Sequence, residues 1–209
     1  MNRSTFRQCL RRAALLLVCG ALAACADPKG DYKPEAGDVV FQSFPHSPLT
    51  DAIETASQSP YSHCGLVVRK GQGFAVLEAI GPVMETPLDL WIRRGRDQGF
   101  AAFRLKPEQA GKIDSFITAA YRFRGRPYDM HYDFDDEKIY CSELVFKAFR
   151  NATGEELGIV RKLGDLQWKP VEKFIRVLEG GKLPLDRPMI TPKDLSEAPQ
   201  LQLLVKKDI

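Results

Sequence analysis

Short apolar runs dominate the first half of the chain, and their composition predicts strands. Runs rich in Val, Leu and Phe, bounded by Gly, Pro and charged residues, predict strands over 38–43, 63–69, 74–80 and 101–106. The sequence Lys-Gly-Gln-Gly at 70–73 separates the second run from the third and indicates a hairpin between them. A short helix is expected over 49–57.

Helical spacing appears in the second half of the chain. A helix is predicted to begin at Pro107 and to continue to about Phe123. Another is predicted from Cys141, with apolar residues at i, i+3, i+4, i+7 and i+8, and Gly154 closes it. Residues 128–138, between these helices, are acidic and irregular. Because strands and helices are partly segregated along the chain, an α+β fold is expected.

Residues 1–24 have the pattern of a secretory signal peptide, with four arginines, a short apolar stretch and small residues at the end. The segment ends in Leu22-Ala-Ala-Cys25, which resembles a bacterial lipobox and implies cleavage before Cys25 and lipid attachment to its sulfur. A plain secretory signal with a chance cysteine is the alternative. Residues 25–35 are then a lipidated tether, and Ala26 favours the outer over the inner membrane. We therefore expect a lipoprotein of the bacterial cell envelope that faces the periplasm.

The composition is that of an ordinary folded domain. Of 209 residues, 44% are hydrophobic and 27% charged, so an ordered core is expected. No apolar run reaches 18 residues, which excludes a polytopic membrane protein. Four of the 30 basic residues lie in the signal, which leaves 26 against 27 acidic residues. This balance indicates no nucleic-acid partner, and a monomer is expected.

Three residues stand where their chemistry is unexpected. Cys141 falls in the first turn of a predicted helix, where backbone N–H groups favour a thiolate, although most free cysteines are small buried side chains. His63 and Glu78 interrupt apolar strands, where each needs a polar partner. A satisfied core histidine and an exposed edge-strand glutamate are the alternatives. Cys64 is the other cysteine expected in the folded part, so a disulfide with Cys141 is also open.

No pattern for a metal or cofactor stands out. The acidic run from Asp129 to Glu137 lacks the glycine and the terminal glutamate of a calcium loop. Zinc-ligand spacing, a glycine-rich phosphate loop and a GxSxG elbow do not occur. We therefore expect neither a metal nor a cofactor.

The loop of the predicted hairpin determines whether His63 and Glu78 can meet. They share a face of the sheet only if the loop has an even number of residues, as with Gly-Gln alone. In that register Gly65 lies opposite Glu78, and His63 becomes a diagonal neighbour of Glu78 on the same face. A three-residue loop would place the two side chains on opposite faces.

The order and spacing of several short motifs resemble the YiiX-like enzymes, which are circularly permuted NlpC-type cysteine hydrolases of papain-like fold. The motifs are GDVVF at 37–41, SHCGL at 62–66, LEA at 77–79, TPL at 86–88, GRPYD at 125–129, YCSELV at 140–145 and ITP at 190–192. The resemblance implies an antiparallel sheet or small barrel packed against the helix that carries the cysteine. The resemblance spans roughly residues 36–195. We expect the catalytic domain over 36–183, and the proline-rich residues 184–209 are expected to form an extension packed on it.

The resemblance also implies roles for individual residues. Cys141 would be the nucleophile, His63 the base and Glu78 the group that orients the imidazole. Possible donors to the oxyanion, or contacts to substrate, are the Cys141 backbone N–H and the side chains of Ser62, Tyr128 and Tyr140. Cys64 has no implied role; as the strand neighbour of His63 it is expected to face away from Cys141, which disfavours a disulfide.

These residues favour a membrane-anchored cysteine amidase or peptidase, with peptidoglycan peptides as the candidate substrate. A lipid acyltransferase or acyl hydrolase that uses the same three residues is the alternative. A non-catalytic envelope-binding lipoprotein is a further alternative, although none of the three residues is missing.

Overall fold

The computed structural model describes residues 27–209. The expected signal peptide (1–24) and the expected lipidation site at Cys25 lie outside the described residues. Within residues 27–209, no helix has the length and apolar character needed to cross a membrane.

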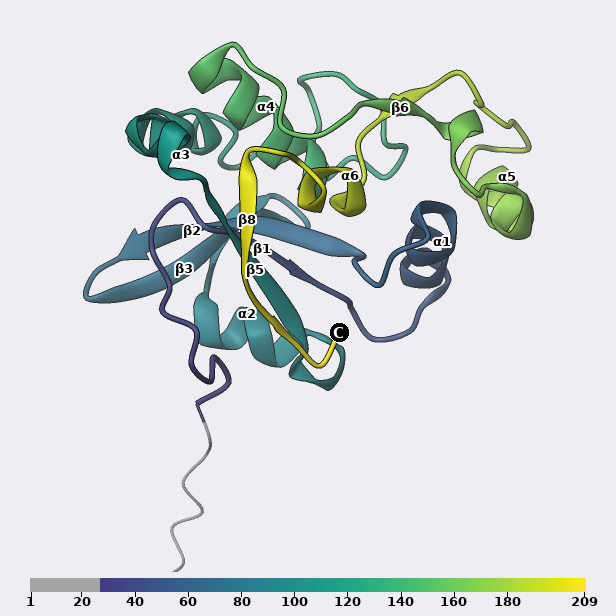
Figure 1. The fold of residues 1–209 in the computed structure, drawn as a ribbon. Coiled ribbons are helices and arrows are strands. Elements are labelled where there is room, and N and C mark those ends of the chain that lie inside the picture. The colour runs from purple at the N-terminus through teal and green to yellow at the C-terminus, as the bar shows by residue number, and fades with distance from the viewer. Residues whose placement is uncertain (1–26) are drawn as a thin grey trace, which may run out of the picture.

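A single six-stranded antiparallel sheet forms the centre of the domain (Figure 1). Its strands are ordered β4-β3-β2-β1-β5-β8. Their bounds are Val39–Gln42 for β1, His63–Lys70 for β2, Gly73–Ala79 for β3, Val83–Pro87 for β4, Phe100–Leu105 for β5 and Leu201–Lys207 for β8. The four strands expected from apolar runs are thus present as β1, β2, β3 and β5. The two outermost strands, β4 and β8, were not expected. The α+β expectation is confirmed.

The two faces of the sheet carry different helices (Figure 1). The larger core lies between one face and the helices α3 (Ile113–Tyr121), α4 (Cys141–Thr153) and α6 (Pro192–Ser196). The smaller core lies on the other face, beneath α2 (Leu88–Arg94). Helices α1 (Pro48–Ser57) and α5 (Glu172–Leu178) lie beyond one end of the strands. The remaining short elements are β6 (Arg161–Lys162), β7 (Pro188–Met189) and four 3-10 turns.

Helix α4 has the bounds that the sequence predicts, because both ends carry local signals. It begins at Cys141 and ends before Gly154, which adopts φ 78°. The helix expected from Pro107 is instead split: a 3-10 turn covers Pro107–Lys112, and α3 begins only at Ile113. Gly111 lies within the 3-10 turn, and glycine weakens a helix interior.

The loop between β2 and β3 has an even number of residues, which gives the predicted pairing of the two strands. Lys70 pairs with Gly73 across a two-residue loop, and Leu66 lies opposite Leu77. Gly71 opens the loop with φ 58°, a conformation that glycine adopts without strain. His63 and Glu78 therefore lie on one face of the sheet, as expected.

Both ends of the described chain are more tightly integrated than the expected boundaries suggest. Tyr32, within the expected tether, is buried and donates a hydrogen bond to Asp38 at 2.7 Å. The expected C-terminal extension is part of the domain architecture, because β8 completes the sheet beside β5. Ile190 and Leu195 belong to the larger core. Residues after 184 thus contribute to both the sheet and the larger core.

Candidate active site

Cys141, His63 and Glu78 come together where α4 begins beside the end of the hairpin. His63 is the first residue of β2, Glu78 is the next-to-last of β3, and Cys141 is the first residue of α4. The exposed fraction is 2% for His63, 0% for Glu78 and 3% for Cys141, so all three are shielded from bulk water. The motifs SHCGL, LEA and YCSELV, which contain these three residues, thus lie close together in the fold.

The start of α4 is held in place by the C-terminal segment. The Tyr140 hydroxyl accepts a hydrogen bond from the Ile190 amide at 3.0 Å, and the Ser142 hydroxyl donates to the Ile190 carbonyl at 2.8 Å. The Tyr140 amide also donates to the Glu143 carboxylate at 3.3 Å. These contacts fix the helix end that presents Cys141, and they account structurally for the ITP motif near the end of the chain.

Glu78 binds one nitrogen of the His63 ring. His63 Nε2 and Glu78 Oε2 are 2.5 Å apart, which leaves Nδ1 as the ring nitrogen available to Cys141. Burial alone would raise the pKa of Glu78, but the hydrogen bonds and charges of His63 and Arg94 lower it to about 2. Glu78 is therefore ionised at neutral pH and can stabilise an imidazolium.

Three further donors surround the Glu78 carboxylate, and the sequence did not point to them. Thr86 Oγ1 donates at 2.5 Å, Trp91 Nε1 at 2.9 Å and an Arg94 guanidinium nitrogen at 2.6 Å. Thr86 lies in the TPL motif at 86–88, but the family resemblance implied no role for this residue. Trp91 and Arg94 carried no comparable signal, because their relation to Glu78 depends on how α2 packs beneath the sheet.

The electrostatics favour an ion pair between Cys141 and His63. Burial lowers the pKa of His63, but the hydrogen bonds and charges of Cys141 and Glu78 outweigh it and raise the pKa to about 9. The pKa of Cys141 lies well below its ordinary value, with a hydrogen bond from the Cys64 side chain as the largest cause. Burial opposes this shift, and His63 adds to it. The arrangement can therefore hold a thiolate beside an imidazolium near neutral pH.

The expected orientation of Cys64 is wrong. Its side chain lies in the larger core together with Cys141, on the helix side of the sheet, and both cysteines are free thiols. His63 reaches the same region although it belongs to the other face, because it stands at the very end of its strand. Burial raises the pKa of the Cys64 thiol well above its usual value, so Cys64 remains a hydrogen-bond donor. The orientation of Cys64 therefore gives no reason against a disulfide with Cys141.

The expected oxyanion donors differ in their surroundings. The Tyr128 hydroxyl is buried, 3.3 Å from that of Tyr132, and Cys141 is among the groups that raise the pKa of Tyr128. Tyr140 is engaged with Ile190, as described above. Ser62 Oγ accepts from the Phe44 amide at 3.0 Å and lines the clefts on both sides of the site. Tyr128 and Tyr140 thus both remain candidates, because the Tyr140 hydroxyl only accepts from Ile190 and keeps its own proton to donate.

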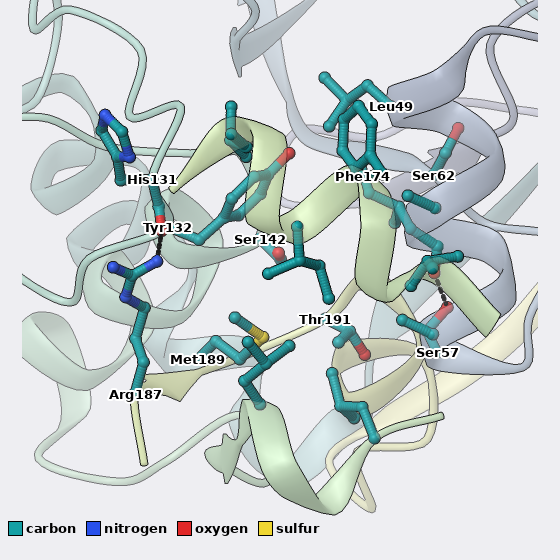
Figure 2. Close-up of a pocket in the computed structure, with 18 of the residues that line it drawn as sticks. Leu49, Ser57, Ser62, His131, Tyr132, Ser142, Phe174, Arg187, Met189 and Thr191 are labelled. Atoms are coloured by element: carbon teal, nitrogen blue, oxygen red, sulfur yellow. Dashed lines mark hydrogen bonds between the residues drawn. The ribbon is translucent and has the colours of Figure 1, made fainter. Parts of the chain in front are cut away.

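An apolar cleft lined in part by Cys141 opens between α1 and α5, and Figure 2 shows side chains of its wall. The space between its walls, with the solvent at its mouth included, is about 730 Å³. Helix α1, helix α5 and the strand β7 with the residues that follow it form its walls. Apolar lining residues include Leu49, Ile53, Leu163, Phe174, Ile175, Leu178 and Met189. His131 and Arg187 stand together on one side, where Arg187 donates to the His131 carbonyl (Figure 2). A second cleft of about 450 Å³, with His63 and Tyr128 in its wall, lies next to it.

Two comparisons with YiiX proteins agree with this architecture. The uncharacterized protein YiiX of Escherichia coli strain K12 is 34% identical over 186 residues, which cover 86% of this chain and 90% of that protein. The crystal structure of the metalloprotein YiiX from Escherichia coli O157:H7 superposes with a TM-score of 0.80 at 32% identity, covering 84% of this chain and 99% of that one. Within residues 27–209 here, no group of three or more His, Cys, Asp or Glu side chains is arranged to hold a metal ion.

The family model for permuted papain-like amidases of the YaeF/YiiX group, family C92, matches residues 33–205. This match spans all six strands except the last residues of β8, and it includes Cys141, His63 and Glu78. The chain therefore belongs to the YaeF/YiiX family of permuted papain-like amidases.

Proposed function

We propose that this protein is a cysteine hydrolase that cleaves an amide or ester bond to an apolar acyl group, with Cys141 as nucleophile, His63 as base and Glu78 as orienting carboxylate. The observation that carries the proposal is the apolar cleft beside Cys141. A substrate bound there would place its acyl chain among α1 and α5 and its carbonyl carbon at the sulfur. A lining in which apolar side chains predominate is suited to such a chain.

The chemistry follows from the buried ion pair. The Cys141 thiolate attacks the carbonyl carbon, and the electron pair of the C=O bond moves to the oxygen. Collapse of this oxyanion breaks the bond to the leaving group, which takes a proton from His63. Water then gives a proton to His63 and attacks the thioester, which releases a carboxylic acid and restores the thiolate. If an alcohol or amine replaces the water, the same residues perform acyl transfer.

Two groups can stabilise the oxyanion. The backbone N–H of Cys141 lies in the first turn of α4, where it has no partner within the helix. A buried tyrosine hydroxyl is the second. Tyr140 only accepts from the Ile190 amide and keeps its own proton to donate, and Tyr128 lies 3.3 Å from the Tyr132 hydroxyl. We assign the Cys141 N–H as one donor and the hydroxyl of Tyr128 or Tyr140 as the other.

Peptidoglycan peptides are the less favoured substrate. Their stem peptides carry several charged groups, each of which needs a polar partner when it enters a cleft. The cleft beside Cys141 offers such groups mainly at His131, Glu179 and Arg187, and Arg187 already pairs with Glu179 at 2.6 Å. A short polar substrate would leave most of the apolar lining exposed to water.

A series of acyl substrates tests the proposal. We expect kcat/KM for N-acyl amides and acyl esters to rise with chain length, by up to about fourfold per methylene, since one buried methylene contributes about 0.8 kcal/mol. Ile175→Asp in the cleft wall should abolish this dependence. Val177→Asp is the matched control, because Val177 lies on the same helix and is 76% exposed. Activity without chain-length dependence, or cleavage of peptidoglycan peptides alone, would contradict the proposal.

We further propose that Cys25 carries lipid and holds the domain at an envelope membrane. The support is the lipobox sequence that ends at Cys25. An anchored hydrolase would work close to lipid substrates, which is consistent with the apolar cleft.

A further inference from the structure

Arg94 makes two contacts that converge on His63. Its guanidinium donates to Glu78 Oε2 at 2.6 Å, the same oxygen that binds His63 Nε2. It also lies over the Phe44 ring, 5.0 Å from the centroid. Phe44 in turn stacks on the imidazole of His63, with ring centroids 4.6 Å apart and an interplanar angle of 22°. Arg94 therefore touches both the carboxylate that binds the imidazole and the ring that covers it.

Arg94 also balances the charge of the buried site. With Cys141 as thiolate, Glu78 ionised and His63 protonated, the three groups carry a net charge of −1 behind protein. The Arg94 guanidinium brings this sum to zero. Placing an uncompensated charge in the interior is costly, because the surrounding protein screens it less than water does.

Within the described residues, no other lysine or arginine pairs with Glu78. Glu78 is faced by His63 from β2, by Thr86 from β4 and by Trp91 and Arg94 from α2, with Cys64 nearby. Groups that interact with the thiol include His63, Cys64, Tyr128, Tyr132 and Tyr140. Within the described chain, Arg94 is thus the one permanently cationic side chain that pairs with Glu78.

The fold does not depend on Arg94 to hold α2. Leu88, Trp91 and Ile92 of this helix are buried in the smaller core and attach it to the sheet. The Arg94 side chain is 30% exposed, so part of it meets solvent. If Arg94 served only to attach α2 to the sheet, a guanidinium would not be needed at this position.

We propose that Arg94 is a positioning residue, which keeps Glu78 ionised and, through Phe44, keeps the His63 ring directed at Cys141. The inference rests on the proposed roles of these three residues, but it is independent of the substrate. Loss of Arg94 has the same effect on the thiol by two routes. If Glu78 takes up a proton, the imidazolium loses its partner; if Glu78 stays charged, its unbalanced charge opposes the thiolate. Either way thiolate formation requires a higher pH.

The test measures alkylation of Cys141 by iodoacetamide against pH, with the labelled site identified by mass spectrometry. The neutral variants Arg94→Gln and Arg94→Met should shift the midpoint of the reactivity curve upward by up to about one pH unit, because the shift of about 1–3 belongs to an adjacent charge and Arg94 acts on the thiol through Glu78 and His63. At pH values below the midpoint this is a loss of up to about tenfold in rate. Arg94→Lys should return the curve toward wild type because it restores the charge.

Arg93→Gln is the matched control, because Arg93 is the exposed neighbour of Arg94 on the same helix. It should leave the curve unchanged. Wild-type curves for folded Arg94→Gln and Arg94→Met, an equal shift in Arg93→Gln, or an Arg94→Lys curve shifted as far as Arg94→Met would each overturn the proposal. Because alkylation needs no substrate, failure to find acyl hydrolysis would leave this result intact.

Discussion

At the scale of single residues, the unexpected neighbour of Cys141, the proposed nucleophile, is Cys64. Its thiol stays protonated because it is buried, and its hydrogen bond is the largest contribution to the low pKa of Cys141. We expect Cys64→Ala to raise the pKa of Cys141, so that alkylation at mildly acidic pH becomes slower. Cys64→Ser retains a donor and should lie closer to wild type. The measurement is the rate of Cys141 alkylation as a function of pH.

The control for this experiment is Cys141→Ala. Since burial raises the pKa of Cys64, this variant should show no rapidly reacting thiol at neutral pH. An unchanged midpoint in Cys64→Ala, or fast labelling of Cys64 in Cys141→Ala, would show that Cys64 does not act as the donor.

At the scale of elements, the β2–β3 hairpin brings His63 and Glu78 together only because Gly65 has no side chain. A Cβ at Gly65 would lie 2.4 Å from Val76 Cγ1, 3.0 Å from the Leu77 carbonyl oxygen and 3.2 Å from Glu78 Cβ. We expect Gly65→Ala to lower the free energy of unfolding by about 1–3 kcal/mol, as overpacking does, and to displace Glu78 from His63. Urea unfolding measures the first effect and the pH curve of Cys141 alkylation measures the second.

Gly73 at the other end of the same hairpin provides the comparison. A Cβ there would meet only the Lys70 carbonyl oxygen, at 3.9 Å, so Gly73→Ala should change little. If the two alanine variants were equally stable and equally reactive, the close approach at Gly65 would have no functional consequence.

At the scale of the whole molecule, the chain leaves the domain on the α2 side of the sheet, opposite α4 (Figure 1). Tyr32 is packed against Phe100, with ring centroids 5.7 Å apart. The chain meets the domain even earlier, because Pro28 is buried and its carbonyl accepts from Lys207 at 3.2 Å. Lys29 also pairs with Asp89 of α2 at 2.7 Å. If Cys25 carries lipid, only residues 26 and 27 separate it from Pro28, which would keep the domain against the membrane surface.

We therefore expect Cys25→Ala to move the protein from the membrane fraction to the soluble fraction and to abolish metabolic labelling with palmitate. The folded domain should be unaffected, because Cys25 precedes Tyr32; purified Cys25→Ala should keep the Cys141 alkylation curve of the wild-type protein. Palmitate incorporation that persisted in Cys25→Ala would refute lipidation at this cysteine.

Local patterns determined much of the architecture. The central strands and α4 follow from apolar spacing and from end signals such as Gly154, since these act between residues close in the chain. The meeting of His63 with Glu78 follows from the parity of a two-residue loop. The family resemblance identified Cys141, whose position in the sequence alone equally suited a small buried side chain.

Tertiary packing decided what no local pattern contains. β4 includes Pro87 and β8 is partly exposed, so neither edge strand resembles the apolar runs of the centre. The bond from Arg94 to Glu78 depends on α2 crossing beneath the sheet, and the apolar cleft depends on α1 meeting α5. Cys64 faces Cys141 because α4 packs on that side of the sheet, while His63 reaches the thiol from the end of its strand. Strand alternation gives the face on which a side chain lies, whereas the element that packs on that face is set by contacts between residues far apart in the chain.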